Sequence, residues 1–150
     1  MTKNERQEMA PQSMVERFHR LFDIRVQEKP GPIDERTRVL RERLIQEEFD
    51  ELKQAMTHDD LAAIAKELAD LLYVVYGTAV SYGIDMDPVF REVHRSNMSK
   101  IGGYKREDGK WIKPPSYSPA AIAPILVRQQ LEMERVIESS EPSQEVEPRA

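Results

Sequence analysis

Apolar residues recur along this chain at steps of three and four, the spacing that places them on one face of an α-helix. The spacing predicts five helices, over about 12–27, 34–56, 61–82, 88–97 and 119–138. No stretch alternates with period two for long enough to predict a strand, and the sequence has no internal repeat. The predicted fold class is therefore all-α.

Helix breakers and capping residues separate these elements. The two prolines and one glycine of 28–32 predict a short loop, and the polar segment 57–60 predicts a tight turn. Gly83 is a natural helix stop, the Asp87–Pro88 pair should begin the fourth helix, and the Ser118–Pro119 pair should begin the last one.

The segments outside the helices differ in character. Residues 101–118 are rich in glycine, proline and basic side chains, and they predict an extended loop. We expect a flexible N-terminus over 1–11, one domain over 12–138 and a disordered tail over 139–150.

The helix that ends near Tyr82 is apolar on nearly every face. Between Leu68 and Val80 its only charged residue is Asp70. A chain of 150 residues with polar loops cannot cover such a helix on all sides. We therefore expect the helices 34–56 and 61–82 to form an antiparallel hairpin, and two hairpins to form a four-helix bundle in a homodimer or a dimer of dimers.

Carboxylates occur on both helices of this hairpin. At about 100° per residue, the first set fits one arc of its helix, and the two residues of the second set lie about 60° apart. Because the helices are antiparallel and joined near residue 58, positions near 48 lie across from positions near 68. The sequence therefore predicts that five carboxylates converge: Glu47, Glu48, Glu51, Glu67 and Asp70.

Two interpretations of these carboxylates are open. The first set alone is typical of a solvated helix face, since Glu is a good helix former. Asp70 favours a metal site instead, because an ionised carboxylate in an apolar run needs a cation and no Lys or Arg lies between Glu67 and Val80. Hard oxygen ligands favour Mg²⁺ or Mn²⁺, and no histidine spacing fits zinc or a di-iron centre. Such an ion would bridge phosphate oxygens and prepare water for attack on phosphorus.

Charge and composition limit the partners that the chain is expected to bind and the compartment in which it is expected. The formal net charge is −5, which argues against stable binding to nucleic acid or to an anionic membrane. The absence of cysteine removes disulfides and thiol nucleophiles. Without an apolar signal stretch or a run long enough to span a bilayer, the chain is expected to be cytoplasmic.

The two carboxylate motifs, with Leu71-Leu72-Tyr73 and Gly83-Ile84 after them, resemble the all-α nucleoside triphosphate pyrophosphatase superfamily over residues 14–118. This superfamily includes MazG proteins, dimeric dUTPases, dCTP pyrophosphatases and phosphoribosyl-ATP pyrophosphohydrolases. The continuation from Phe90 to Lys100, then Asp108-Gly109-Lys110 and Lys113-Pro114, is most similar to the MazG-like group with a dUTPase-type member from Deinococcus.

The resemblance implies a MazG-like fold and a metal-dependent hydrolase. Its reaction would cleave a nucleoside triphosphate, such as the dNTP dUTP, between the α and β phosphates to give the monophosphate and pyrophosphate. The five carboxylates would hold two or three Mg²⁺ ions, with Mn²⁺ as the other candidate. Glu48 would orient or deprotonate the attacking water.

Substrate contacts are expected from the loop, the fourth helix and the first helix. Lys100, Lys110 and Lys113 would reach the outer phosphates, and Asn97 would bond the sugar or the base. Phe18 and His19 could contact the base, although Phe18 is equally typical of a core residue and His19 of a surface residue. Tyr73 either packs in the core or points at the substrate, and Trp111 is either an anchor for the loop or a lid.

Two other functions stay open. Phosphoribosyl-ATP hydrolysis in histidine synthesis is one, although that branch usually carries a glycine before the Glu pair, where this chain has Gln46. The other is a helical interaction module that kept the fold without activity. The presence of all five carboxylates argues against a decayed site.

Overall fold

The computed structural model describes residues 10–140. This part of the chain contains five helices and one two-stranded hairpin, which confirms the all-α class. The predicted flexible N-terminus and disordered tail fall outside the described residues, except that residues 10 and 11 and residues 139 and 140 are described. The elements are α2 (Pro11–Leu21), α3 (Glu35–Thr57), α4 (Leu61–Tyr82), α5 (Met86–Met98), β1 (Tyr104–Lys105), β2 (Trp111–Ile112) and α6 (Ala123–Ser140).

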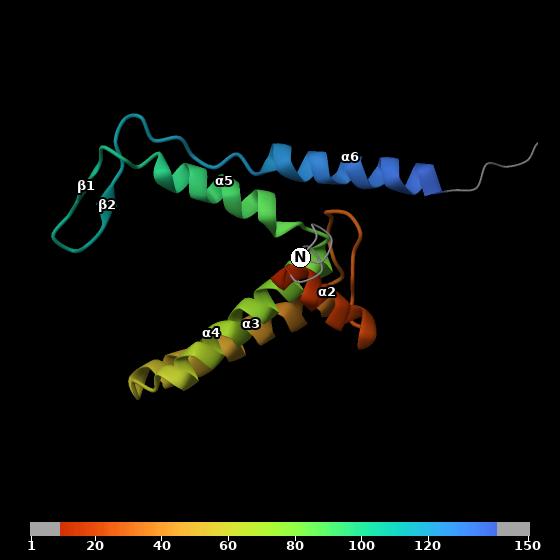
Figure 1. Cartoon of the computed structure of the whole chain (residues 1–150), viewed down its shortest axis with the longest axis horizontal. Coiled ribbons are helices and arrows are strands. Elements are labelled where there is room, and N and C mark those ends of the chain that lie inside the picture. Colours follow the sequence, from red (N-terminus) through yellow and green to blue (C-terminus); the bar gives the residue numbers. More distant parts are fainter. Residues whose placement is uncertain (1–9, 141–150) are drawn as a thin grey trace, which may run out of the picture.

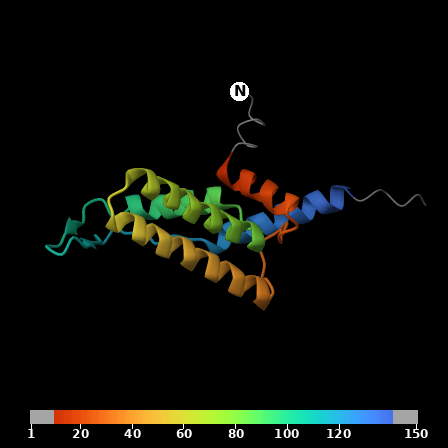
Figure 2. The ribbon, with the colours of Figure 1, turned by 90° about the horizontal axis from the view of Figure 1, so that it is seen from below.

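The helices α3 and α4 form the predicted antiparallel hairpin, seen side by side in Figures 1 and 2. Asp34 caps α3 by accepting a hydrogen bond from the backbone amide of Thr37 at 2.9 Å. Asp60 caps α4 in the same way. Gly83 ends α4 in the left-handed region at φ 70°, a conformation that glycine adopts without a steric penalty. The capping residues of this hairpin were predictable because each acts on its own helix.

The first helix is shorter than predicted. It ends at Leu21, and Asp23 turns the chain with a positive φ of 53°. The following residues run extended along the end of α4, where the amide of Gln27 donates to the Val80 carbonyl at 3.1 Å. The prediction of a helix to residue 27 was therefore wrong, because contacts with α4 replace further helical bonds.

The start of α5 also differs from the prediction. Asp85, rather than Asp87, is the N-cap, and its side chain accepts from the Asp87 amide at 3.0 Å. Asp87 and Pro88 lie inside the first turn. There, the missing amide of proline costs nothing, since no helical partner exists for it.

The last helix begins four residues later than predicted, at Ala123, and it runs to Ser140. The preceding segment is held extended against α5. Arg95 donates to the Pro119 carbonyl at 3.1 Å, and the Ala121 amide donates to Glu92 at 2.9 Å. These long-range bonds, which no local pattern reveals, displace the predicted cap at Ser118 and Pro119.

The predicted loop 101–118 contains a short antiparallel hairpin. Tyr104 pairs with Ile112 and Lys105 pairs with Trp111. Trp111 fastens the hairpin to the end of α5 by donating from Nε1 to the Lys100 carbonyl at 2.8 Å. Of the two roles considered for Trp111, the structure shows the anchor.

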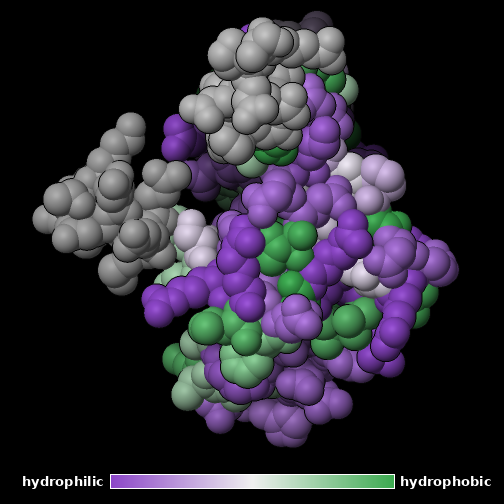
Figure 3. All heavy atoms as spheres, turned by 90° about the vertical axis from the view of Figure 1, so that its right-hand side faces the viewer, coloured by the Kyte–Doolittle hydropathy of each residue, from purple (hydrophilic) through white to green (hydrophobic). Residues whose placement is uncertain are grey.

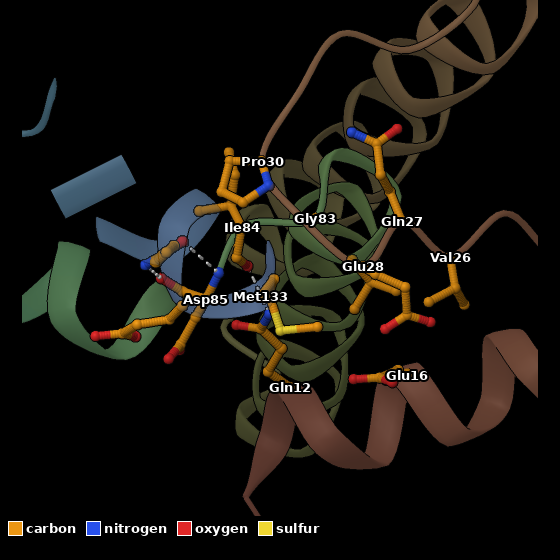
Figure 4. Close-up of a pocket in the computed structure, with 13 residues that line it drawn as sticks. Gln12, Glu16, Val26, Gln27, Glu28, Pro30, Gly83, Ile84, Asp85 and Met133 are labelled. Carbon is orange, nitrogen blue, oxygen red and sulfur yellow. Dashed lines mark hydrogen bonds between the residues drawn. The ribbon is translucent and has the colours of Figure 1, made fainter. Parts of the chain in front are cut away.

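Two glutamines clamp the connection between α4 and α5. Gln12 of α2 donates to the Ile84 carbonyl at 2.6 Å and accepts from the Met86 amide at 3.0 Å. Gln129 of α6 bonds both the amide and the carbonyl of Asp85. A hollow of about 360 Å³ lies at this junction, and Gln12 and Asp85 are among its lining residues (Figure 4). Here these side chains serve to join helices.

The described chain has two parts, which we call the body (α2, α3 and α4) and the arm (residues 86–122). The principal contacts between helices are those of α3 and α2 with α4. The arm leaves the body at the α4–α5 connection, extends to the hairpin and returns to the start of α6 (Figures 1 and 2). The end of α5 and the hairpin together, residues 97–113, form the tip of the arm.

Few apolar side chains of the described residues are buried: Val15, Leu52, Ala79 and Val80. Large apolar residues are exposed on every helix, and on α4 they include Leu68 and Leu72, the latter 56% exposed. Figure 3 shows such side chains reaching the surface among hydrophilic ones. In the described part of the chain, no helix combines the length and apolar character that a membrane span requires.

Candidate active site

Three of the five predicted carboxylates lie together in the body. Glu48 of α3 faces Glu67 and Asp70 of α4, and one oxygen from each residue lies within 4.8 Å of the other two. We call these three residues the carboxylate cluster. All three side chains are partly exposed, so a solvated ion or a phosphate can reach them.

Negative charges lie close together in the carboxylate cluster, and they change the pKa of one of its members. The pKa of Glu48 is raised, first by burial and then by the negative charges of Asp70 and Glu51. Hard carboxylate oxygens at this spacing fit a divalent cation such as Mg²⁺, which would relieve the repulsion. The donor set and its charge therefore fit the predicted metal.

Asp70 is not the isolated buried charge that its apolar surroundings indicated. Its side chain is 40% exposed, and the Lys66 ammonium lies 2.7 Å from its Oδ2. Lys66 also lies 3.1 Å from Glu67. The sequence argument considered only residues after Glu67 and missed a lysine one turn before Asp70, although pairs four residues apart on a helix meet. The ammonium of Lys66 therefore offsets part of the negative charge of Glu67 and Asp70, and a bound metal ion would take its place.

The other two predicted ligands lie beside the cluster. Glu51 is close enough to raise the pKa of Glu48, and with Glu67, His58 and Asp60 it lines a hollow of about 420 Å³. Glu47 lies outside the cluster, and Arg43 is its ion-pair partner at 3.6 Å. Metal binding by Glu47 and Glu51 stays a prediction.

An aromatic group lies next to the cluster. Tyr73 is one turn after Asp70, and its ring meets that of Phe18 edge to face with centroids 5.6 Å apart. Phe22, which the sequence interpretation did not select, packs against Phe18 with centroids 4.4 Å apart. All three rings are exposed in part. We call Phe18, Phe22 and Tyr73 the aromatic patch.

His19 is buried and does not belong to this patch. The residue is 2% exposed, its Nδ1 lies 3.0 Å from the Arg25 carbonyl, and its Nε2 lies 3.4 Å from Nη1 of Arg41. Because a carbonyl only accepts and a guanidinium only donates, the ring is neutral with its proton on Nδ1. Burial is the main cause of the lowered pKa of His19. Its ring therefore packs the interior and is closed to a base.

The glycine Gly77 makes room for this buried pair. A methyl group at Gly77 would lie 2.6 Å from Nη1 of Arg41 and 2.9 Å from Nε2 of His19. The Nε of Arg41 is buried without a hydrogen-bond partner among the described residues. A glycine in the middle of a helix is the sequence signal that could have revealed this close packing.

The remaining predicted substrate residues lie on the arm. Lys100 donates to Oδ1 of Asn97 at 2.6 Å, so the two share one face as their spacing predicts. Together with Trp111 they line a shallow hollow of about 270 Å³. Lys113 lies over the ring of Tyr117 at 4.0 Å, and Lys110 is exposed on the hairpin. The structure brings these residues together on the arm, apart from the carboxylate cluster.

Comparison with known protein families gives one match. The profile of phosphoribosyl-ATP pyrophosphohydrolase matches residues 15–97, which is more than half of the chain. The chain belongs to this family. The matched range contains the carboxylate cluster and the aromatic patch, whereas the tip of the arm begins where the match ends.

Membership of the family places the chain in the MazG-like all-α pyrophosphohydrolase superfamily and makes it a hydrolase of the pyrophosphohydrolase type. The comparison with individual curated proteins gives no match. The likeness to a dUTPase-type member from Deinococcus therefore stays a prediction.

Proposed function

We propose that the protein hydrolyses a nucleoside triphosphate between the α and β phosphates, releasing the monophosphate and pyrophosphate. The observation that carries the proposal is the carboxylate cluster, with oxygens of Glu48, Glu67 and Asp70 within 4.8 Å of one another on the matched family domain. A triphosphate adds negative charge, so the site needs divalent cations before substrate can enter.

The residues of the cluster have distinct proposed roles. Glu67 and Asp70, with Glu48 and Glu51, would hold Mg²⁺, which when bound neutralises phosphate oxygens and lowers the pKa of a coordinated water. Glu48 is the group with the raised pKa, and a carboxylate oxygen of this residue would orient the attacking water or accept its proton.

The aromatic patch supports a nucleoside as the substrate. Tyr73 lies one helical turn after Asp70, and the partly exposed rings of Phe18 and Phe22 extend from it, so one bound nucleotide could place its base on these rings and its phosphates at the cluster. Stacking on these rings is sequence-tolerant, because every base has a π-face. We propose a dNTP such as dUTP as the substrate.

Phosphoribosyl-ATP is the second candidate, and the family match favours it. Its reaction would break the same bond with the same carboxylates. The two candidates differ in the base side of the site, where phosphoribosyl-ATP carries an additional ribose phosphate.

Pyrophosphate release from a panel of dNTPs, NTPs and phosphoribosyl-ATP, with Mg²⁺, with Mn²⁺ and with chelator, tests the proposal. Reaction in ¹⁸O-labelled water should place the label in one product only, as attack on a single phosphorus requires. We expect turnover only with a divalent cation and no release of single phosphate. No hydrolysis of any nucleotide in the panel would contradict both candidates.

A variant measured with the same substrates tests the alternative that the protein is a helical interaction module without activity. Glu48→Gln should abolish turnover in an enzyme while it leaves binding to a protein partner unchanged. Asp50→Asn is the matched control, because Asp50 lies on the same helix and pairs with Lys53 at 2.9 Å, away from the cluster.

A homodimer, alone or as half of a dimer of dimers, completes the proposed function. The apolar residues Leu68, Leu72 and Val75 lie on the side of α4 opposite Asp70 and are exposed in the single chain. Covering them with the same face of a second copy would form a four-helix bundle. Light scattering coupled to size-exclusion chromatography should therefore give a mass of two or four chains.

A further inference from the structure

One ammonium group already lies among the carboxylates of the cluster. The Nζ of Lys66 lies 2.7 Å from Oδ2 of Asp70, 3.1 Å from Oε1 of Glu67 and 3.2 Å from Oε2 of Glu67. Its charge also acts on Glu48, whose pKa is raised by burial first and then by Asp70, and is lowered by Lys66. The side chain of Lys66 therefore holds a positive charge at the place where the cluster would bind a metal ion.

The contacts of Lys66 differ from those of an ordinary surface pair on the same hairpin. Lys53 pairs with one exposed carboxylate, that of Asp50, at 2.9 Å and outside the cluster. Lys66 contacts two carboxylates at once, and the side chain of Glu67 is only 12% exposed. A metal ion that binds Glu67 and Asp70 competes with the ammonium for the same oxygens. Lys66 must therefore leave them, in part or fully, when the cluster binds metal.

The side chain of Lys66 has room to leave these oxygens. It is 62% exposed, and the residues three and four positions before it on α4 are the small Ala63 and Ala62. A lysine ammonium is a compact charge on a flexible stem, and it binds phosphate oxygens as a point charge. A triphosphate held by metal ions in the cluster brings phosphate oxygens next to the carboxylates that Lys66 leaves. The displaced ammonium thus finds a new anionic partner at the same site.

We propose that Lys66 couples metal binding to phosphate binding: it donates to Asp70 and Glu67 while no metal is bound, and it donates to a phosphate group of the substrate once metal occupies the cluster. The inference rests on the proposed function. Metal alone breaks the ion pairs of Lys66 without replacing them, whereas metal together with phosphate replaces them. Lys66 therefore weakens the binding of free metal and strengthens the binding of metal with phosphate. By linkage, each ligand tightens the binding of the other by the same factor.

Calorimetry with Mg²⁺ and inorganic pyrophosphate tests the coupling without a nucleoside and without turnover. Mg²⁺ is titrated into the protein alone, and pyrophosphate is titrated in saturating Mg²⁺. Lys66→Met should tighten the binding of Mg²⁺ alone and weaken the binding of pyrophosphate about tenfold, as the loss of one charge-assisted hydrogen bond predicts. Lys66→Arg, which keeps the charge, should stay within about threefold of wild type in the pyrophosphate titration. Lys53→Met, which removes the matched pair with Asp50, should change neither affinity.

Steady-state kinetics give a second measurement of the same contact. In saturating Mg²⁺, Lys66→Met should raise the KM for the triphosphate about tenfold and leave kcat nearly unchanged, because the hydrogen bond to phosphate is present before and during the reaction. Lys66→Arg should restore the KM. The exposed position of Lys66 makes a folding defect in Lys66→Met unexpected, and its circular dichroism and unfolding temperature should match those of wild type.

The opposite direction of the two changes in Lys66→Met is the result that supports the inference. Pyrophosphate binding as tight as in wild type would overturn it, and so would a wild-type protein that binds no pyrophosphate in Mg²⁺. A parallel loss of Mg²⁺ and pyrophosphate binding would also overturn it, because Lys66 would then only maintain the shape of the cluster. If the two affinities change as expected but the wild-type protein hydrolyses no nucleotide, the inference stands and the proposed function is contradicted.

Discussion

The helices α3 and α4 hold polar side chains at two levels that differ in their electrostatics. At the first level, Arg41 of α3 and His19 of α2 both meet Gly77 of α4, and the group is buried. At the second level, seven residues along each helix and about 10 Å away, Glu48 faces Asp70 and the group is open to solvent.

The two levels are also balanced in different ways. The first level places a buried guanidinium beside a neutral ring whose lone pair accepts one of its hydrogen bonds, while Nε of Arg41 has no partner among the described residues and burial lowers the pKa of Arg41. The second level gathers like charges, and a single exposed lysine offsets them. This difference teaches that the first level is a closed contact that fixes the packing of three helices, whereas the second gathers negative charge where a ligand can reach and balance it.

The largest expected effect is the loss of activity at the second level. Asp70→Asn should lower kcat/KM by about 100-fold or more, because a ligand of the metal is removed. Thermal unfolding in chelator should show no loss of stability, because the substitution removes one of several like charges. A clear decrease in the unfolding temperature would show that Asp70 is structural, and Asp50→Asn is the control for activity.

At the first level we expect the opposite result: Gly77→Ala should lower the stability of the fold and leave the activity nearly unchanged. The added methyl group would lie 2.6 Å from Nη1 of Arg41 and 2.9 Å from Nε2 of His19, and both of these residues are buried. We expect a loss of about 1–2 kcal/mol in the free energy of unfolding by urea, after the gain in helix propensity is included. Activity at low temperature should stay close to wild type, so a large loss of kcat would mean that the two levels are coupled.

The pH dependence of stability tests the first level separately, because His19 belongs to it. Because the folded state lowers the pKa of His19, the unfolded chain binds its proton more readily, and stability falls as the pH drops below about 6.5. Arg41 opposes protonation of the ring and Glu16 favours it. His19→Gln should flatten the fall between pH 7 and pH 5.5 in urea unfolding. His94→Gln, at an exposed position on α5, is the matched control.

The smallest effect concerns Lys66, the internal counter-ion of the cluster. Lys66→Met should tighten Mg²⁺ binding by up to about fivefold in calorimetry, because an exposed ion pair is worth at most about 1 kcal/mol. Lys53→Met removes the matching pair with Asp50 and should leave the affinity unchanged. Weaker Mg²⁺ binding by Lys66→Met would show that this lysine helps to shape the site.

The hairpin and its cluster could be predicted because the information is local. Asp34, Asp60 and Gly83 set the ends of the two helices, and the short connection fixes the register. Once the register is known, Glu48 must lie across from Asp70. The convergence of carboxylates therefore follows from the sequence without knowledge of the remaining chain.

The rest depends on residues far apart in the sequence. The extended segment before α6 is fixed by Arg95, and the end of α2 is fixed by contacts with Val80. His19 was expected either to contact the base or to lie at the surface, but it follows Val15 by one turn and packs against residues of two other helices. No pattern along α2 alone reveals Arg41 or Gly77.

The anchoring of Trp111 at the tip of the arm has an optical consequence. This is the only tryptophan of the chain, it is 43% exposed, and its indole nitrogen is bonded to the Lys100 carbonyl. Indole emission therefore comes from one place in the molecule. A change in its wavelength on dilution or on nucleotide addition would follow the arm in real time, in the native chain and without a label.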